Sequence, residues 1–314
     1  TNAMLSFVFL MLKPVFMLKF VTHLLLAFIV LSFSACTQDQ SVLPDNHYMI
    51  GEGERPWVIA HGGAKQLWPE NTMIAFAGSA ALGVDVLEMD IRMTKDKLLV
   101  CHHDADIENM SNDTGKTWNY TYNELLNFNF GDGFEDIDGE FPYKNQQVDI
   151  TKLEAVFSAF PLFYFVVEIK DTEALGQEAG DSLFALIERY NLHSRIIVAS
   201  FDEDVLIHFR EVSANLIPTS ASQKESTNFV ISTKAQASYF YHPNAVAFQL
   251  PLKQIGISMD RKHVIKAAHR HKMAVHYWTI NEKEDMRDLI EKGADGLITD
   301  RPDIMLDLLK EMGW

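Results

Sequence analysis

The sequence predicts an α/β fold of the (β/α)₈ type, a TIM barrel with an insertion after an early strand. Short apolar runs alternate with longer amphipathic segments from Pro56 to the end of the chain, the pattern of repeated βα units around a parallel sheet. One long stretch, residues 104–148, breaks this alternation. The chain has 314 residues, 47% of them hydrophobic, which suffices for one domain of barrel size and a leader.

The expected strands are short apolar runs, and the expected helices are longer amphipathic segments. Asp202 and Asn281 are suitable N-cap residues for two of the helices. The expected strands are 57–60, 84–92, 98–101, 163–169, 196–200, 216–218, 245–249, 274–278 and 296–298. The expected helices are 71–82, 152–160, 173–190, 202–212, 261–271, 282–292 and 302–312.

The insertion, residues 104–148, is rich in Asn, Asp, Gly and aromatic residues, and only 122–128 has a helical pattern. It is too long for an ordinary connecting loop. In a barrel, a long insertion after a strand lies over the C-terminal face, where barrel enzymes bind their substrates.

Residues 1–36 read as a leader and not as part of the barrel. Thr1-Asn2-Ala3 has the composition of a tag remnant, and the following apolar stretch starts at Met4 or, in a shorter form, at Met17. Small residues stand directly before Cys36, which resembles the lipobox of bacterial lipoproteins. An ordinary secretory leader and an uncleaved membrane anchor are the alternatives. The run is Leu31-Ser32-Phe33-Ser34-Ala35-Cys36.

The lipobox predicts a chain anchored by lipid at Cys36 in a bacterial cell envelope, facing the periplasm or the cell surface. Residues 37–54 are polar and contain Pro44 and two glycines, so they are expected to form a flexible tether. The barrel is then expected to span residues 55–314.

The chain is strongly acidic, with a formal net charge of -16 at pH 7 and a pI of about 5.1. Such a chain repels nucleic acid, so a nucleic-acid partner is excluded. An anionic substrate would need a bound cation or a few placed Lys, His and backbone N–H groups. The two cysteines, Cys36 and Cys101, do not form a disulfide scaffold, and Cys101 is expected to pack in the core.

Glu88 and Asp90 are two residues apart on an apolar strand, so both carboxylates point to the same face. Burial of two like charges favours a neutralising cation, and hard oxygen ligands suit Mg²⁺ or Ca²⁺. An exposed edge strand is the alternative. Glu168 and Lys170 lie two residues apart at the end of another apolar strand, so they also share one face. Either Glu168 completes the metal site and Lys170 contacts a phosphate oxygen, or the two form a simple ion pair.

His61 and His103 each follow a predicted strand, which places both imidazoles where barrel catalysis occurs. Two histidines that titrate near neutrality can remove and deliver the two protons of a phosphodiester hydrolysis. A structural role is the alternative for each. His102 adjoins His103 and points to the opposite face; we choose His103 because Asp104 follows it.

Two further segments could place backbone near an anion. Gly62 and Gly63 follow His61 in a turn, and Glu70-Asn71 opens the first helix, whose N–H groups attract negative charge. An ordinary turn and an ordinary helix start explain these segments equally well.

Taken in order, these pieces resemble the signature series of glycerophosphodiester phosphodiesterases. The resemblance runs from about Trp57 to Leu309 and implies a TIM barrel that uses one divalent cation, Mg²⁺ or Ca²⁺, to hydrolyse glycerophosphodiesters to sn-glycerol 3-phosphate and an alcohol. The pieces are His61-Gly62-Gly63, Pro69-Glu70-Asn71-Thr72, Glu88-Met89-Asp90, Thr94-Lys95-Asp96, His103-Asp104, Glu168-Ile169-Lys170, Trp278-Thr279-Ile280-Asn281 and Gly293 to Pro302.

The resemblance also implies a role for each matching residue. The metal ligands would be Glu88, Asp90 and Glu168, and the general acid and base would be His61 and His103. Lys170 would contact phosphate or glycerol, and Trp278 would form an apolar wall or simply pack in the barrel. The site would be supported by Glu70, Asn71 and Asp104. The order of acid and base, and the choice between water and a glycerol hydroxyl as nucleophile, remain open at this level.

One position departs from the family pattern. The family commonly has Arg after the first histidine, and this chain has Gly62, so a bidentate phosphate clamp is lost. We expect Lys65, or backbone N–H groups of Gly62 and Gly63, to compensate.

Two other functions fit parts of the sequence. A phospholipase D-like or C-like enzyme acting on lysophospholipids or membrane lipids is supported by the aromatic insertion. A non-catalytic surface protein that binds headgroups is disfavoured by the retained acid and histidine set. The aromatic residues of the insertion are Trp118, Tyr120, Tyr122, Phe128, Phe130 and Phe134.

Overall fold

Parallel strands form the centre of the structure, as the alternating apolar segments predict. The computed structural model describes residues 46–314 except 52, 243 and 255. The leader with Cys36 and most of the predicted tether lie outside the described residues. Asn46–Trp314 forms one unit. Every helix within the described part of the chain is too short or too polar to cross a lipid bilayer.

Seven parallel strands surround the barrel axis in the order β6, β5, β2, β1, β11, β10, β7. Between β6 and β7 the ring is closed by single bridges, Val198 to Thr219 and Ser220 to Ala247, where a strand was expected at 216–218. This confirms the predicted barrel. The strands are β1 Trp57–Ala60, β2 Val86–Met93, β5 Tyr164–Ile169, β6 Ile196–Ala199, β7 Ala247–Leu250, β10 Ala274–Tyr277 and β11 Gly296–Thr299.

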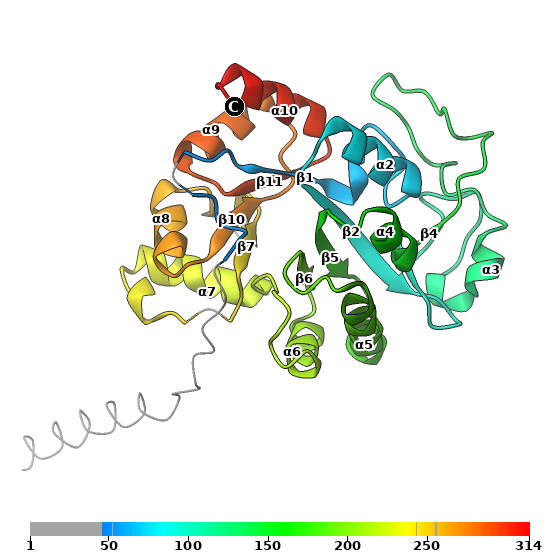
Figure 1. Cartoon of the computed structure of the whole chain (residues 1–314), viewed down its shortest axis with the longest axis horizontal. Helices are drawn as coiled ribbons and strands as arrows, with labels where there is room; N and C mark the ends of the chain where they lie inside the picture. Colours follow the sequence, from blue (N-terminus) through cyan, green and yellow to red (C-terminus); the bar gives the residue numbers. More distant parts are fainter. Residues whose placement is uncertain (1–45, 52, 243, 255) are drawn as a thin grey trace, which may run out of the picture. The chain divides into compact units, whose positions relative to one another are not determined.

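Helices surround the strands (Figure 1). Most expected helices are present within two residues of the predicted ends. The additional helix, α7, is polar and rich in Thr and Ser, but the capping box formed by Ser222 and Glu225 marks its start. The helices are α2 Met73–Leu82, α4 Leu153–Ala159, α5 Glu173–Tyr190, α6 Glu203–Val212, α7 Gln223–Lys234, α8 Lys262–Arg270, α9 Lys283–Lys292 and α10 Pro302–Glu311.

The expected strand at 98–101 is not a barrel strand. It forms β3 (Leu99–Cys101), which pairs antiparallel with β2 and then with β4 (Thr151–Lys152). Only a short turn separates β2 from β3, and a parallel crossover needs a dozen or more residues. This hairpin therefore carries the residues after Cys101 back towards the mouth of the barrel.

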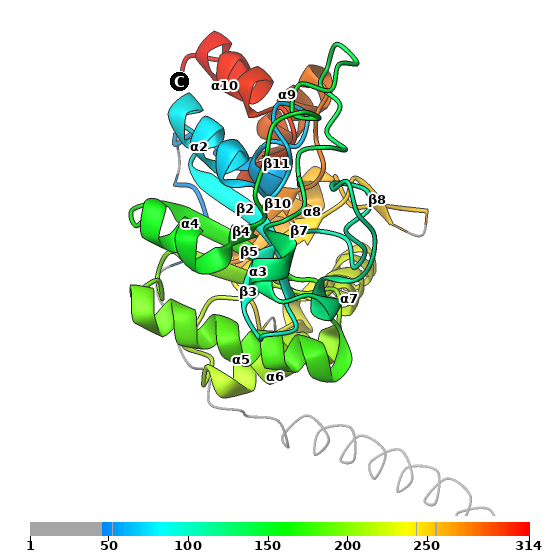
Figure 2. The same ribbon diagram turned by 90° about the vertical axis from the view of Figure 1, so that its right-hand side faces the viewer.

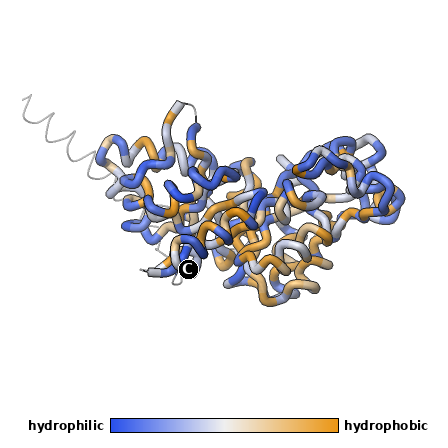
Figure 3. Tube along the Cα trace, turned by 90° about the horizontal axis from the view of Figure 1, so that it is seen from above, coloured by the Kyte–Doolittle hydropathy of each residue, from blue (hydrophilic) through white to orange (hydrophobic). Residues whose placement is uncertain are grey.

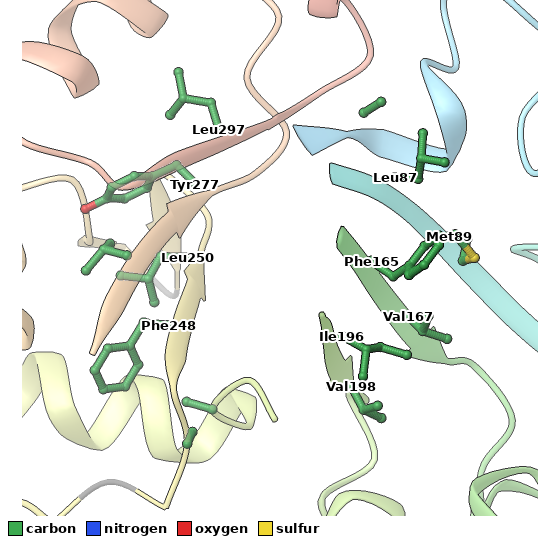
Figure 4. Packing of buried hydrophobic residues seen from close by; sticks show 14 of the residues in the cluster. Leu87, Met89, Phe165, Val167, Ile196, Val198, Phe248, Leu250, Tyr277 and Leu297 are labelled. Atoms are coloured by element: carbon green, nitrogen blue, oxygen red, sulfur yellow. The ribbon is translucent and has the colours of Figure 1, made fainter. Parts of the chain in front are cut away.

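The strands divide the core into two layers because their side chains alternate. The outward-pointing residues pack under the helices and form the larger cluster, as Figure 4 shows for Leu87, Phe165, Phe248 and Tyr277. A smaller cluster comes from the inward-pointing positions. It contains Ile59, Val86, Val166, Ile197, Val246, Ala247, Ala274 and Ile298, together with Tyr48.

The described chain begins against the barrel, earlier than the start predicted near Arg55. The Asn46 side chain donates to the carbonyls of Val246 and Lys272 at 2.6 and 2.8 Å. Tyr48 is only 3% exposed and packs against Trp57 and Tyr164, with ring centroids 5.6 and 6.1 Å apart. Residues 46–50 thus cover the N-terminal end of the barrel interior, opposite the C-terminal strand ends.

The insertion packs on its own small core outside the barrel. It contains the short elements η2 (Thr117–Asn119) and α3 (Tyr122–Leu125), and the remainder is irregular. Its loops lie beside the barrel in Figure 1 and face the viewer in Figure 2; they are largely hydrophilic in Figure 3, whereas the central strands are hydrophobic. The small core consists of Val100, Ile107, Leu125, Phe130 and Ile150.

Tyr48→Ala should lower the free energy of unfolding by about 3–5 kcal/mol, because it empties a buried aromatic site. Tyr48→Phe should be neutral or slightly stabilising, since the buried hydroxyl has no hydrogen-bond partner among the described residues. His47→Ala, at the adjacent exposed position, is the matched control. Urea unfolding measures all three, and equal midpoints for Tyr48→Ala and the unchanged protein would contradict the packing role.

Candidate functional site

Three carboxylates meet inside the C-terminal end of the barrel. Glu88 and Asp90 alternate with apolar residues on β2, and Glu168 lies beside Asp90 on β5 in the parallel register. Each of the three offers an oxygen atom, and these oxygens all lie within 4.8 Å of one another. The alternation that packs Leu87 and Met89 under the helices turns these carboxylates inward.

Burial and the nearby charges shift the pKa values of the three carboxyl groups. Burial, with the charge of Asp90, raises the pKa of Glu88 to about 7. Burial also raises the pKa of Glu168. Asp90 is buried too, but the ammonium groups of Lys65 and Lys170 outweigh burial and hold its pKa below the usual range. The cluster therefore holds protons that a divalent cation would displace.

The oxygen donors of the cluster fit a hard divalent cation. Asp90 Oδ1 and Glu168 Oε1 are buried and have no hydrogen-bond partner among the described residues. Lys170 Nζ lies 3.1 and 2.7 Å from these oxygens, which is ion-pair distance without hydrogen-bond geometry. Lys65 and Lys170 leave the charge of the three carboxylates only partly compensated, and the remaining oxygen lone pairs suit Mg²⁺ or Ca²⁺.

His61 follows β1 and is held by a carboxylate. Its Nδ1 lies 2.7 Å from Asp300 Oδ1, and Asn281 Nδ2 donates to the other oxygen of Asp300 at 2.8 Å. Burial by itself lowers the pKa of His61, but the hydrogen bond to Asp300 and the charge of Glu88 raise it overall. Sequence reasoning assigned no role to Asp300; its place in the final motif, directly after β11, was the available signal.

His103 reaches the same cavity from the β2–β3 hairpin and not from a barrel strand. Its Nδ1 lies 2.8 Å from Asp104 Oδ1, and Asn109 of the insertion donates to the other oxygen of Asp104 at 2.7 Å. His102 is buried, contacts the carbonyl of Asp106 through Nε2, and packs on Phe130. The structure thus places His103, and not His102, at the cavity.

Asn71 fixes the position of Asp90. Its Nδ2 donates to Asp90 Oδ2 at 2.9 Å, and its Oδ1 accepts from the Asp90 backbone N–H at 3.0 Å. Glu70 pairs with Lys65 at 2.7 Å. Lys65 Nζ also lies 3.6 Å from Asp90 Oδ2. Both residues of the helix start therefore act on the carboxylate cluster.

The backbone N–H of Gly62 serves the carboxylate cluster, and the anion contact expected of Gly63 stays a prediction. The Gly62 N–H donates to Glu88 Oε2 at 2.6 Å, so it is already used by the carboxylate cluster. A Cβ at Gly63 would lie 2.8 Å from the Cβ of Ala75, so this glycine permits close packing of α2. A Cβ at Gly62 would lie 2.6 Å from Cε of Lys65. Lys65 therefore occupies the space beside Gly62 and neutralises carboxylates.

The acidic and basic groups open into a cavity of about 500 Å³. His61, Glu88, His103, Glu168 and Lys170 line one side of it. Trp278 lines the cavity as predicted, with its Nε1 donating to the Gln249 carbonyl at 3.0 Å. Cys101 is buried away from the cavity, and burial raises the pKa of its thiol, which agrees with a packing role.

Protein without metal should become less stable as pH rises from about 5 to 8. A carboxyl whose pKa is raised by folding contributes stability below its unfolded pKa and loses it as pH rises through the folded value, here about 7 for Glu88. Mg²⁺ or Ca²⁺ in excess should reverse this trend, because binding displaces the protons. Urea midpoints measured across this window test it, with Glu88→Gln as the comparison variant; a flat metal-free profile would contradict it.

Comparisons with known proteins agree with this geometry. The sequence profile of the Glycerophosphoryl diester phosphodiesterase family matches residues 61–304. A protein of Caldanaerobacter subterraneus subsp. tengcongensis named glycerophosphodiester phosphodiesterase is 26% identical over 265 residues, which is 82% of this chain and 98% of that protein.

Solved structures show the same fold. A putative glycerophosphoryl diester phosphodiesterase from Silicibacter pomeroyi has a TM-score of 0.67 at 24% identity and covers 84% of this chain and 96% of its own. An Oleispira antarctica phosphodiesterase, solved with the product sn-glycerol-3-phosphate, has a TM-score of 0.67 at 18% identity. The match covers 82% of this chain and 97% of that protein's chain. The profile spans most of the chain, and the chain therefore belongs to the glycerophosphoryl diester phosphodiesterase family.

Proposed function

We propose that this protein hydrolyses glycerophosphodiesters to sn-glycerol 3-phosphate and an alcohol. The observation that carries the proposal is one cavity lined by two histidines and two carboxylates of the acidic cluster. His61 and His103 are each oriented by an aspartate through Nδ1, which leaves Nε2 of each ring to exchange a proton with substrate.

Glu88, Asp90 and Glu168 would hold the divalent cation, Mg²⁺ or Ca²⁺. When bound, such a cation neutralises phosphate charge and lowers the pKa of a hydroxyl that contacts it. Asn71 and the Gly62 N–H keep two of the carboxylates in place. Lys170, at the cavity wall, would contact a phosphate oxygen.

The two histidines divide the proton transfers. His61 has a raised pKa and a carboxylate partner in Asp300, both of which favour its protonated form, so His61 would deliver a proton to the departing alkoxide. His103 is more exposed and would accept the proton of the attacking hydroxyl. The new P–O bond forms as the bond to the leaving oxygen breaks, and the two proton transfers balance.

A phospholipase D-like or C-like enzyme acting on lysophospholipids or membrane lipids is not favoured. Of the described residues that line the cavity, none comes from the six aromatic residues of the insertion. Phe130 and Phe134 are instead buried in the insertion's own packing. A non-catalytic headgroup binder would not need two histidines that are each oriented by an aspartate.

The site of action follows from the leader. We propose that Cys36 is lipidated and that the barrel works in a bacterial cell envelope on the extracytoplasmic side. Its sequence context supports this, because small residues precede the cysteine and an apolar stretch precedes them.

Purified protein should hydrolyse glycerophosphocholine, glycerophosphoethanolamine or glycerophosphoglycerol in the presence of Mg²⁺ or Ca²⁺, and leave lysophospholipids intact. Chelation should abolish turnover, because the carboxylate cluster would then repel the phosphate. Coupled detection of released sn-glycerol 3-phosphate measures this. Turnover that persists with chelator would remove the cation from the reaction. Release of lysophosphatidic acid or of a monoacylglycerol from a lysophospholipid would favour the phospholipase D-like or C-like enzyme.

Asp300→Asn should lower kcat/KM by about 10- to 100-fold, the range for loss of an orienting partner. It should also shift the limb of the pH–rate profile that reports His61 to lower pH, because the negative charge that raises the pKa of His61 is gone. Asp303→Asn, which loses a surface pair with Arg301, is the control. An unshifted profile would show that Asp300 has no influence on the histidine.

Cys36→Ala, expressed in bacteria with the native leader, should release the protein from the membrane fraction. It should also abolish incorporation of labelled fatty acid, since the thiol that carries the diacylglycerol is gone. Cys101→Ala is the matched control, because that cysteine is buried in the hydrophobic core. Labelling of the Cys36→Ala protein at the unchanged level would exclude this cysteine as the anchor.

A further inference from the structure

The cavity extends beyond the acidic cluster to a far side lined by residues of β7, α7 and the short strand β8 (Lys253–Gln254). We propose that residues of β7, α7 and β8 bind a neutral, hydroxyl-bearing headgroup, such as glycerol or another polyol, in preference to a cationic one. This inference rests on the proposed function, since it concerns the alcohol released by the same site.

The volume of the cavity leaves room for such a group. A water molecule in the liquid occupies about 30 Å³. If each of the ten or so non-hydrogen atoms of glycerol phosphate is given the volume of one water molecule, the whole group fills roughly 300 Å³. The cavity measures about 500 Å³, so space for a second small group remains.

Two polar side chains at the far side are without partners. Ser226 of α7 lines the cavity, is only 3% exposed, and its Oγ has no hydrogen-bond partner among the described residues. Gln249 points inward from β7, and its Nε2 is likewise buried without a partner. Buried polar groups are normally hydrogen-bonded, so these two are placed to meet a ligand.

The chemistry of these groups matches a hydroxyl. A serine hydroxyl and a glutamine amide each both donate and accept hydrogen bonds, and so does an alcohol. Gln223 of α7 and Gln254 of β8 extend the same lining with further amides. The hairpin of β8 and β9 (Ile257–Ser258) that carries Gln254 projects at one edge of the barrel in Figure 2.

A cationic headgroup finds no counter-charge on this side. Glu88 and Glu168 are the carboxylates among the described residues that line the cavity, and both belong to the acidic cluster. The charged residue at the far side is Lys253 of β8, which repels an ammonium group. A choline or ethanolamine headgroup would therefore lose water without gaining an ion pair.

An aromatic cage for choline is also incomplete. Phe201 and Trp278 meet edge to face, with ring centroids 5.8 Å apart. Lys170 Nζ already lies 5.5 Å from the centroid of the Phe201 ring. Recognition of a quaternary ammonium uses several free aromatic faces, and here one face already carries a cation.

The test compares kcat/KM for glycerophosphoglycerol and glycerophosphocholine in the presence of the divalent cation. The unchanged protein should prefer glycerophosphoglycerol by about tenfold. Ser226→Ala and Gln249→Leu should each lower kcat/KM for glycerophosphoglycerol by about fivefold, the factor for one ordinary hydrogen bond, and leave glycerophosphocholine within twofold. Gln223→Glu should shift the ratio towards glycerophosphocholine, because it supplies the missing carboxylate.

Thr227→Val is the matched control for Ser226→Ala. Thr227 is the next residue of α7, its hydroxyl donates to the Gln223 carbonyl at 2.8 Å, and it does not line the cavity. The ratio of the two kcat/KM values should be unchanged in this variant. A preference of the unchanged protein for glycerophosphocholine would overturn the inference. Equal losses on both substrates would also overturn it, because the residues would then hold the shared glycerol phosphate.

Calorimetric binding of the same two diesters separates this inference from the proposed function. If no diester is turned over, the hydrolase proposal fails. Tighter binding of glycerophosphoglycerol, weakened in Ser226→Ala, would still support the polyol subsite, whereas equal binding of both diesters would overturn it.

Discussion

The repulsion among three carboxylates inside one barrel mouth is the constraint around which the site is organised. Glu88, Asp90 and Glu168 are inward-pointing because their apolar neighbours are needed outside, under the helices. Each compensating group then has a defined place. Lys65 and Lys170 lie beside Asp90, which also accepts a hydrogen bond from the Asn71 amide, and the Gly62 N–H donates to Glu88. A divalent cation completes a charge balance that the protein's own groups leave partial.

The sequence alone predicted the parts that depend on periodicity. The alternation within 84–92 and 163–169 indicated which side chains face inward, and the family resemblance added Glu168 to the pair formed by Glu88 and Asp90. The helix ends could be predicted equally well, since N-cap residues and helix-breaking residues are local signals. Helix α7 was missed because its polar, β-branched composition gives a weak amphipathic pattern, although its capping box was visible. These features all depend on neighbours in the chain.

Features that depend on contacts distant in sequence were not predictable in this way. The partner of His61 is Asp300, 239 positions further along the chain, and no periodicity relates the two. Gly62 was expected to face an anion and instead bonds Glu88, since strand β2 brings that carboxylate to it. The antiparallel course of β3 reflects the shortness of one turn, which the apolar pattern of 98–101 does not reveal. Tertiary contacts decided the first two cases, whereas the third depended on the length of the local turn at 94–98.

His103 lies after a hairpin and not on a barrel strand, so this catalytic residue is not part of the strands that form the main core. The acidic cluster belongs to strands whose outward faces form the main core, so change there costs folding. His103 and its partner Asp104 belong to a segment that packs separately, and Asn109 of that segment holds Asp104. Exchange or lengthening of this peripheral segment can therefore retune turnover while the central scaffold remains intact. In such a molecule the turnover rate can evolve independently of the thermal stability.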